Sequence, residues 1–218
     1  MKTSLPKLFL LTTTLLAITT PSMAAVLATE VSGQKLEKVV LSKSATATAK
    51  DKTINLTSVG AGLRAKKVVF VNVKVYVGEL FVADLAKINK TEDAALDSVA
   101  AQPAAAFQLH FLRKVDAETV LKSFKESFTM NSINVEDASI KQLLEAVKNG
   151  GAAEEGKTLT LFALKNADNT ESVTYEGSNG KSTTITGPTG FMKNVFSLWL
   201  GKPSDDGVAD LKKSILKN

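Results

Sequence analysis

The stretch of residues 67–77 constrains the fold more than any other part of this sequence. Its odd positions hold one Lys followed by five Val residues. Its even positions are mixed: Val68, Phe70, Asn72, Lys74 and Tyr76. Successive side chains of a β-strand point to opposite faces, so a period of two indicates a strand. The pattern predicts one continuous strand, with the valines in a core and the mixed face open to solvent, another layer or a ligand.

The other periodic segments predict an α+β fold. Alternation and β-branched residues indicate strands at 53–59, 105–113, 157–164, 171–175 and 182–186, with a break at Gly60-Ala61-Gly62. Helical spacing indicates helices at 92–101, from an Asp116 N-cap through residue 128, at 140–147, and at 191–199 and 208–215. Strands that group early and late, with helices between and after, are typical of an antiparallel sheet with helices on one face.

Residues 1–24 have the pattern of a secretory signal peptide. Lys2 and Lys7 precede or begin an apolar stretch, and a small-residue cleavage pattern ends at Ala24. The apolar stretch is shorter than the roughly 20 residues that cross a bilayer. We expect cleavage after Ala24, with an uncleaved N-terminal anchor as the alternative. No later stretch is long and apolar enough to be transmembrane, so we expect an exported, periplasmic protein.

Composition and organisation exclude several kinds of site. The 218 residues include no Cys, which excludes disulfides, thiolate metal sites and Cys nucleophiles. With His110 as the single His, a multi-histidine metal site is not expected, and no cofactor is predicted. No internal repeat is present. We expect one domain over residues 53–218, preceded by an N-terminal arm or edge strand at residues 25–52.

The positive charge is spread over many lysines. Removing residues 1–24 lowers the net charge from +5 to +3, because that segment carries Lys2 and Lys7 and no acidic residue. The lysines are dispersed and lack interleaved aromatic residues, so a solvated surface is expected and a nucleic-acid partner is not. The oligomeric state stays open.

The two arginines, Arg64 and Arg113, are the candidates for specific recognition. A guanidinium offers five donors in a planar fork and grips a carboxylate with two bonds. Arg64 follows the Gly60-Ala61-Gly62 break, where small residues allow close approach of a ligand or a backbone. It is either an anion-recognition residue beside an apolar pocket or a structural residue bonded to loop carbonyls. Arg113 has the alternative of pairing with an acidic neighbour such as Asp116 or Glu118.

The segment Gly60-Ala61-Gly62-Leu63-Arg64, followed by Phe70 through Tyr76, resembles the chalcone isomerase-like family in its bacterial exported branch. The passage from His110 to Val115 and the C-terminal Trp199-Leu200-Gly201 agree, and the resemblance covers roughly residues 53–216. It implies an open-faced sandwich, a large antiparallel sheet covered by helices. Plant enzymes of the family close a flavanone ring, and other members bind fatty acids. In both groups the Arg that corresponds to Arg64 is implied to hold the anionic group of the ligand.

The chain departs from the enzymes of that family at the positions implied to be catalytic. The enzymes carry a Thr where this sequence has Val71, and a Tyr and an Asn around the start of the following helix, whereas residues 116–131 contain no Tyr. Without donors for the developing enolate, the main electrostatic contribution to catalysis is missing. No residue is therefore assigned a catalytic role, and the predicted ligand-binding residues are Arg64, Val71, Tyr76 and Arg113.

These observations favour a non-catalytic periplasmic protein that binds a small apolar ligand with an acidic head, such as a fatty acid. The tail is expected between the sheet and the helices that bear Phe124 and Phe128, or Phe191 and Phe196. Two alternatives stay open. One is a weak intramolecular lyase or isomerase acting on a phenolic enone, and the other is a structural envelope protein whose pocket is filled by its own side chains.

Overall fold

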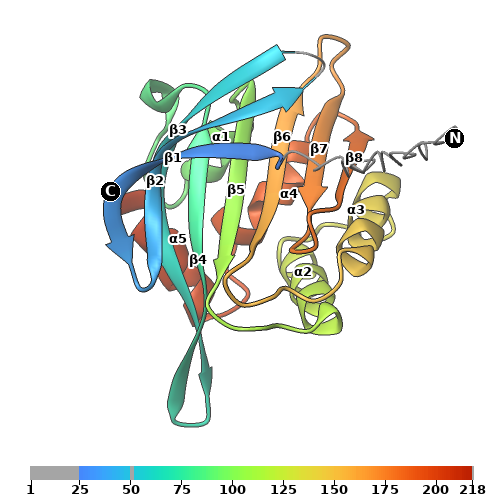
Figure 1. Ribbon diagram of the computed structural model, residues 1–218. Helices are drawn as coiled ribbons and strands as arrows, with labels where there is room; N and C mark the ends of the chain where they lie inside the picture. Colours follow the sequence, from blue (N-terminus) through green and yellow to red (C-terminus); the bar gives the residue numbers. More distant parts are fainter. Residues whose placement is uncertain (1–24, 50–51, 218) are drawn as a thin grey trace, which may run out of the picture.

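A single antiparallel sheet of eight strands, arranged in chain order, forms the frame of the protein (Figure 1). The computed structural model describes residues 25–49 and 52–217. The predicted signal peptide therefore lies outside the described residues. The strands are β1 (Leu27–Leu36), β2 (Val39–Ala49), β3 (Lys52–Val68), β4 (Val71–Val82), β5 (Ala104–Phe111), β6 (Thr158–Lys165), β7 (Glu171–Glu176) and β8 (Ser182–Gly187).

The α-helices cover one face of this sheet, which confirms the predicted α+β fold (Figure 1). They are α1 (Ala95–Ala100), α2 (Ala117–Met130), α3 (Ala138–Asn149), α4 (Phe191–Leu200) and α5 (Asp206–Lys217), with a 3₁₀ turn, η1 (Leu85–Lys87), after β4. Asp116 caps α2 as expected, because its Oδ1 accepts from the Thr119 amide at 2.8 Å. Within the described ranges, none of the helices has the length and apolar character to cross a bilayer.

Two cores hold the sheet, one on each face. The larger core lies between the sheet and the helices, and its fully buried side chains include Phe107, Phe128, Ile140, Leu143, Phe191 and Phe196. A smaller core lies on the opposite face and includes Leu27, Ala45, Leu56, Phe81 and Phe162. Leu80 belongs to the first core and Phe81 to the second, as strand alternation requires. The segment expected as an arm or edge strand thus contains two strands, β1 and β2, which contribute to the smaller core.

The prediction of one continuous strand over residues 67–77 is wrong. β3 ends at Val68, Val69 and Phe70 form a two-residue turn, and β4 begins at Val71, which pairs with Val68. The valine alternation continued across a turn that contains none of the residues that usually mark one. The resulting β3–β4 hairpin extends well beyond the rest of the sheet (Figure 1).

The predicted strand break at Gly60-Ala61-Gly62 is also wrong, because β3 continues through it. Gly62 allows a close approach of helix α5 instead. A Cβ on Gly62 would lie 2.6 Å from the Leu211 carbonyl oxygen, so only Gly lets α5 pack this closely on β3. The sequence predicted that either a ligand or a backbone would approach this segment closely, and the structure shows the backbone of α5 there.

Candidate functional site

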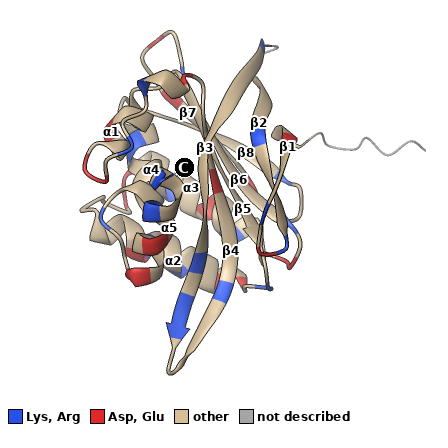
Figure 2. Cartoon of the chain, turned by 90° about the vertical axis from the view of Figure 1, so that its left-hand side faces the viewer, with Lys and Arg blue, Asp and Glu red and all other residues tan. Residues whose placement is uncertain are grey.

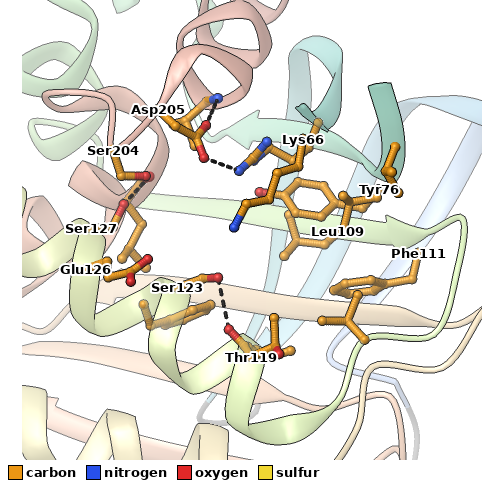
Figure 3. Close-up of a pocket in the computed structure, with 18 of the residues that line it drawn as sticks. Lys66, Tyr76, Leu109, Phe111, Thr119, Ser123, Glu126, Ser127, Ser204 and Asp205 are labelled. Atoms are coloured by element: carbon orange, nitrogen blue, oxygen red, sulfur yellow. Dashed lines mark hydrogen bonds and ion pairs between the residues drawn. The ribbon is translucent and has the colours of Figure 1, made fainter. Parts of the chain in front are cut away.

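A cavity of about 280 Å³ opens between one end of strands β3–β5 and helices α2, α4 and α5 (Figure 3). Its volume is near the lower end of small-molecule pockets, which span roughly 300–1,000 Å³. The floor and walls are mainly apolar and include Val73, Tyr76, Leu109, Phe111, Val120, Phe124, Leu198 and Trp199. The charged residues that line it are Arg64, Lys66, Arg113, Lys114, Asp116, Glu126 and Asp205.

Aromatic rings from four elements meet around this floor. Tyr76 of β4 and Phe111 of β5 pack with ring centroids 5.5 Å apart, and Phe124 of α2 meets Trp199 of α4 edge-on at 6.0 Å. Trp199 is stacked on Phe107 at 4.2 Å, which ties the floor to the main core. Such contacts fix ring positions as well as burying area. The cavity therefore has a rigid apolar floor of defined shape.

One hydrogen bond joins the two polar aromatic groups of the floor. The Trp199 indole N–H donates to the Tyr76 hydroxyl oxygen at 3.1 Å. The Tyr76 O–H donates to no acceptor within the part of the chain that the structure describes, so its proton is available to a ligand oxygen. Burial raises the pKa of the Tyr76 phenol, and the positive charge of Arg64 partly opposes this. Tyr76 is consequently a neutral donor near neutral pH.

Arg64 lines the cavity but is already bonded to protein groups. Its Nη2 donates to Asp205 Oδ2 at 2.6 Å, and its Nη1 donates to the Ala65 carbonyl oxygen. The Arg64 side chain is 11% exposed and that of Asp205 is 38% exposed, so this ion pair is only partly shielded from water. Arg64 lies within β3 beside a register shift rather than in a loop, opposite Tyr76. The structure thus shows a structural function for Arg64, and its predicted contact with a ligand anion stays a prediction.

Two further cations, Lys66 and Arg113, line the cavity without an ion pair among the residues that the structure describes. Figure 3 shows the Lys66 side chain reaching over the cavity. Arg113 does not form the expected pair with Asp116, whose carboxylate instead binds Thr119. Lys66 was not predicted, because the sequence pattern placed it between two expected strands, whereas it lies within β3, two residues beyond Arg64.

The structure brings together three of the four predicted binding residues. Arg64, Tyr76 and Arg113 line the same cavity, whereas Val71 lies at the hairpin tip, 63% exposed and outside the lining. Of the phenylalanines expected beside the ligand tail, Phe124 lines the cavity. The others are core residues that do not line it: Phe128, Phe191 and Phe196. The ligand-binding assignments themselves stay predictions.

Hydroxyl groups of α2 line the cavity but are engaged locally. Thr119 Oγ1 donates to Asp116 Oδ2 at 2.7 Å, and Ser123 Oγ donates to the Thr119 carbonyl at 2.9 Å. His110 does not line the cavity, and its Nε2 lies 2.8 Å from Oε2 of the buried Glu79. Within the described ranges, no group of three or more His, Cys, Asp or Glu residues is arranged to hold a metal ion.

The fold and the cavity define an α+β open-faced sandwich with a mostly apolar pocket between its sheet and its helices. The family model described as chalcone isomerase-like matches residues 28–217, and the chain belongs to this family. A crystal structure of a fatty-acid binding protein from Arabidopsis thaliana is similar, with a TM-score of 0.49 and 14% sequence identity. That match covers 79% of this chain and 98% of the plant chain. No curated protein matches the sequence.

Proposed function

We propose that this protein is a non-catalytic, exported chalcone isomerase-like protein that binds a fatty acid or a similar apolar anion. The observation that carries the proposal is the composition of one cavity: a rigid aromatic floor, with Arg64 and the donor hydroxyl of Tyr76 among its lining. Pockets for apolar ligands combine mainly apolar walls with a few placed polar groups. The size of the cavity suits a single acyl chain.

In this proposal the ligand carboxylate binds beside Arg64 and Tyr76. The guanidinium has five N–H donors, and its bonds to Ala65 and Asp205 leave others for a ligand. Asp205 fixes the position of the guanidinium, but its negative charge also opposes a second anion. Asp205 therefore holds the Arg64 guanidinium in place and also weakens its attraction for the ligand carboxylate. Lys66 and Arg113 add positive charge to the same lining.

Two features favour binding over catalysis. The enolate that forms during ring closure needs several donors aimed at it. The hydroxyls of Thr119 and Ser123 already donate within α2, which leaves the Tyr76 hydroxyl as the available donor of the floor. The position of the family's Thr is occupied by Val71, which lies away from the cavity. The cavity also counts against the structural alternative, in which the pocket is filled by side chains of the protein itself.

The binding proposal is tested by titrating the protein with a saturated fatty acid while recording Trp fluorescence. Trp199 is the only Trp of the chain and lines the cavity, so it reports occupancy directly. Removal of a charge-assisted bond costs about 1.5–3 kcal/mol, so we expect Arg64→Ala to weaken binding on the order of tenfold to a hundredfold. Native mass spectrometry of the purified protein should show bound lipid.

Asp205→Asn is the matched control, because it keeps the shape of the side chain and removes the competing charge. We expect it to bind the fatty acid more tightly than the parent protein. Equal affinity in the parent protein, Arg64→Ala and Asp205→Asn would refute the anchor. A protein that captures no lipid from a mixture would support the structural alternative. Measurable chalcone cyclisation, abolished by Arg64→Ala, would support the enzyme.

Export to the periplasm is part of the proposal and rests on residues 1–24 of the sequence. We expect the protein isolated from the periplasm to begin at Ala25, after cleavage behind Ala24. The intact mass of the isolated protein measures this directly. A mass that includes residues 1–24 would favour the uncleaved anchor.

A further inference from the structure

The tip of the β3–β4 hairpin is the most apolar exposed surface of the described chain. Four consecutive residues are strongly exposed: Val68 (50%), Val69 (76%), Phe70 (95%) and Val71 (63%). Single exposed apolar residues are ordinary, but a contiguous exposed apolar patch usually marks an interaction site. The tip projects beyond the sheet, so no helix covers it (Figure 1).

The turn at this tip is not made of residues that favour a turn. Val69 has a φ of 55°, a left-handed backbone conformation that β-branched residues rarely adopt. Two-residue hairpin turns with a positive φ at the first position usually place Gly there. A Val at this position strains the backbone, and strain of this kind is concentrated at functional sites. The sequence of the tip therefore provides exposed apolar side chains at the expense of a stable turn.

The parts of the two strands nearest the tip carry only positive charge. Residues 60–78 contain no Asp or Glu and include four basic residues, Arg64, Lys66, Lys67 and Lys74. Figure 2 shows basic residues on both strands of the hairpin, between an uncharged tip and the body of the protein. Lys74 binds Glu37 at 2.7 Å, whereas Lys66 and Lys67 have no ion pair within the part of the chain that the structure describes.

The spacing of these residues fits a membrane interface. Lys67 and Lys66 stand one and two residues behind Val68, which is about 3 and 7 Å along a strand. Apolar groups at a membrane surface reach about 5–10 Å into the boundary between headgroups and acyl chains. At that depth the lysines lie among the headgroups. A protein partner would contact one side of the hairpin and would need an apolar patch on that side only. A lipid bilayer surrounds an inserted tip, which suits a hairpin end that is apolar on all sides.

We propose that the β3–β4 hairpin inserts residues 68–71 into the surface of a lipid bilayer and that Lys66 and Lys67 bind its anionic headgroups. Membrane binding by the hairpin does not require the proposed ligand, although the two sites share Val68 and Lys66, which also line the cavity. Docking of the hairpin therefore places the cavity close to the membrane, the source of apolar ligands.

The test places a fluorescent label sensitive to polarity at residue 71. The chain has no Cys, so Val71→Cys introduces one thiol for the label in the protein as isolated from cells. Val31→Cys is the matched control, because Val31 on β1 is 59% exposed, close to the 63% of Val71. The probes are vesicles of phosphatidylcholine mixed with phosphatidylglycerol, and vesicles of phosphatidylcholine alone.

We expect the label at residue 71 to shift to shorter wavelength with the mixed vesicles, and to be quenched by quenchers attached to the lipid. The label at residue 31 should not change. Phe70→Ser and Lys67→Glu, each added to the labelled protein, should weaken vesicle binding by about tenfold or more. Added salt should weaken it further. Neither Phe70 nor Lys67 lines the cavity, so fatty-acid affinity should stay unchanged in both variants.

Three results would overturn this proposal. The label at residue 71 could stay in water at every concentration of mixed vesicles. The emission of this label could shift without lipid as the protein concentration rises, which would show that the tip binds a second copy of the chain. Phe70→Ser could bind vesicles as well as the parent protein does. None of these results depends on whether the cavity binds a fatty acid.

Discussion

Arg64 and Asp205 are 141 positions apart in the sequence, yet Arg64 Nη2 and Asp205 Oδ2 are 2.6 Å apart. The pair joins β3 to the residue that precedes α5. Asp205 Oδ1 also accepts from the Val208 amide at 3.0 Å, so the same carboxylate caps the helix. One side chain thus anchors the start of α5 and holds a lining residue of the cavity in place.

This double role predicts different stabilities for two variants of Asp205. Asp205→Ala removes the cap and the ion pair, and should lower the free energy of unfolding by about 2–3 kcal/mol. Asp205→Asn keeps a capping oxygen and should cost about 1 kcal/mol. Urea unfolding of both variants, with Arg64→Ala and the double variant, gives the coupling energy. We expect about 0.5–1 kcal/mol for this partly exposed pair, and a coupling near zero would contradict it.

The hydrogen bond between Trp199 and Tyr76 predicts the effect of removing one hydroxyl. Tyr76→Phe leaves the indole N–H without an acceptor in a buried place, which should cost about 1–3 kcal/mol of stability. Tyr175→Phe is the control, because Tyr175 is also buried but its hydroxyl makes no hydrogen bond within the described ranges. Its cost should stay within about 0.5 kcal/mol. Thermal unfolding of both variants compares them, and equal losses would rule out the assigned bond.

Features encoded by neighbouring residues were predictable from the sequence. The Asp116 cap needs only residues three positions apart, and the end of α3 at Gly150 follows the residue type that commonly ends helices. The family motif alone indicates Arg64 as a candidate site residue. Each of these predictions depends on a short sequence pattern and not on contacts with distant parts of the chain.

Features that depend on distant packing were not predictable. No local signal links Arg64 with Asp205, because the contact arises only when α5 packs on β3. The hairpin turn at Val69 was hidden by the valine alternation on both sides of it. Gly62 looked like a strand break, although its role is to accommodate Leu211. In each case tertiary packing, and not the local preference of the residue type, determines the structure.

The close approach at Gly62 predicts a large effect for one added methyl group. In Gly62→Ala the Cβ would lie 2.6 Å from the Leu211 carbonyl oxygen, and a backbone atom cannot move aside cheaply. We expect a loss of about 2–3 kcal/mol, because α5 must shift away from β3. Gly33→Ala separates this clash from backbone strain, since Gly33 has a φ of +82° and open space around it. Its cost should be about 1 kcal/mol, and a loss in Gly62→Ala no larger than this would show that α5 adapts freely.

Glu176 predicts a dependence of stability on pH in the chain that keeps residues 1–24, where Ala25 has no charged terminal amino group beside the Val26 amide. It is buried at the end of β7, where its Oε2 accepts from the Val26 amide at 3.2 Å. Burial raises the pKa of this carboxyl above its usual value of 4.5, and the Val26 bond opposes this only in part. The folded protein therefore holds the proton more tightly than the unfolded chain does. Stability from this group is present below pH 4.5 and is lost as the pH rises through the folded pKa.

Glu176→Gln removes this dependence, because the amide stays neutral and still offers an oxygen to the Val26 amide. We expect the variant to be more stable than the parent protein near neutral pH, since the parent must there hold a buried charge. The advantage should shrink on acidification and vanish by about pH 4, where the Glu176 carboxyl is protonated in both states. Thermal unfolding of the two proteins from neutral to acidic pH measures the difference. A difference that stays constant over this range, or grows toward acidic pH, would show that Glu176 does not titrate with a raised pKa.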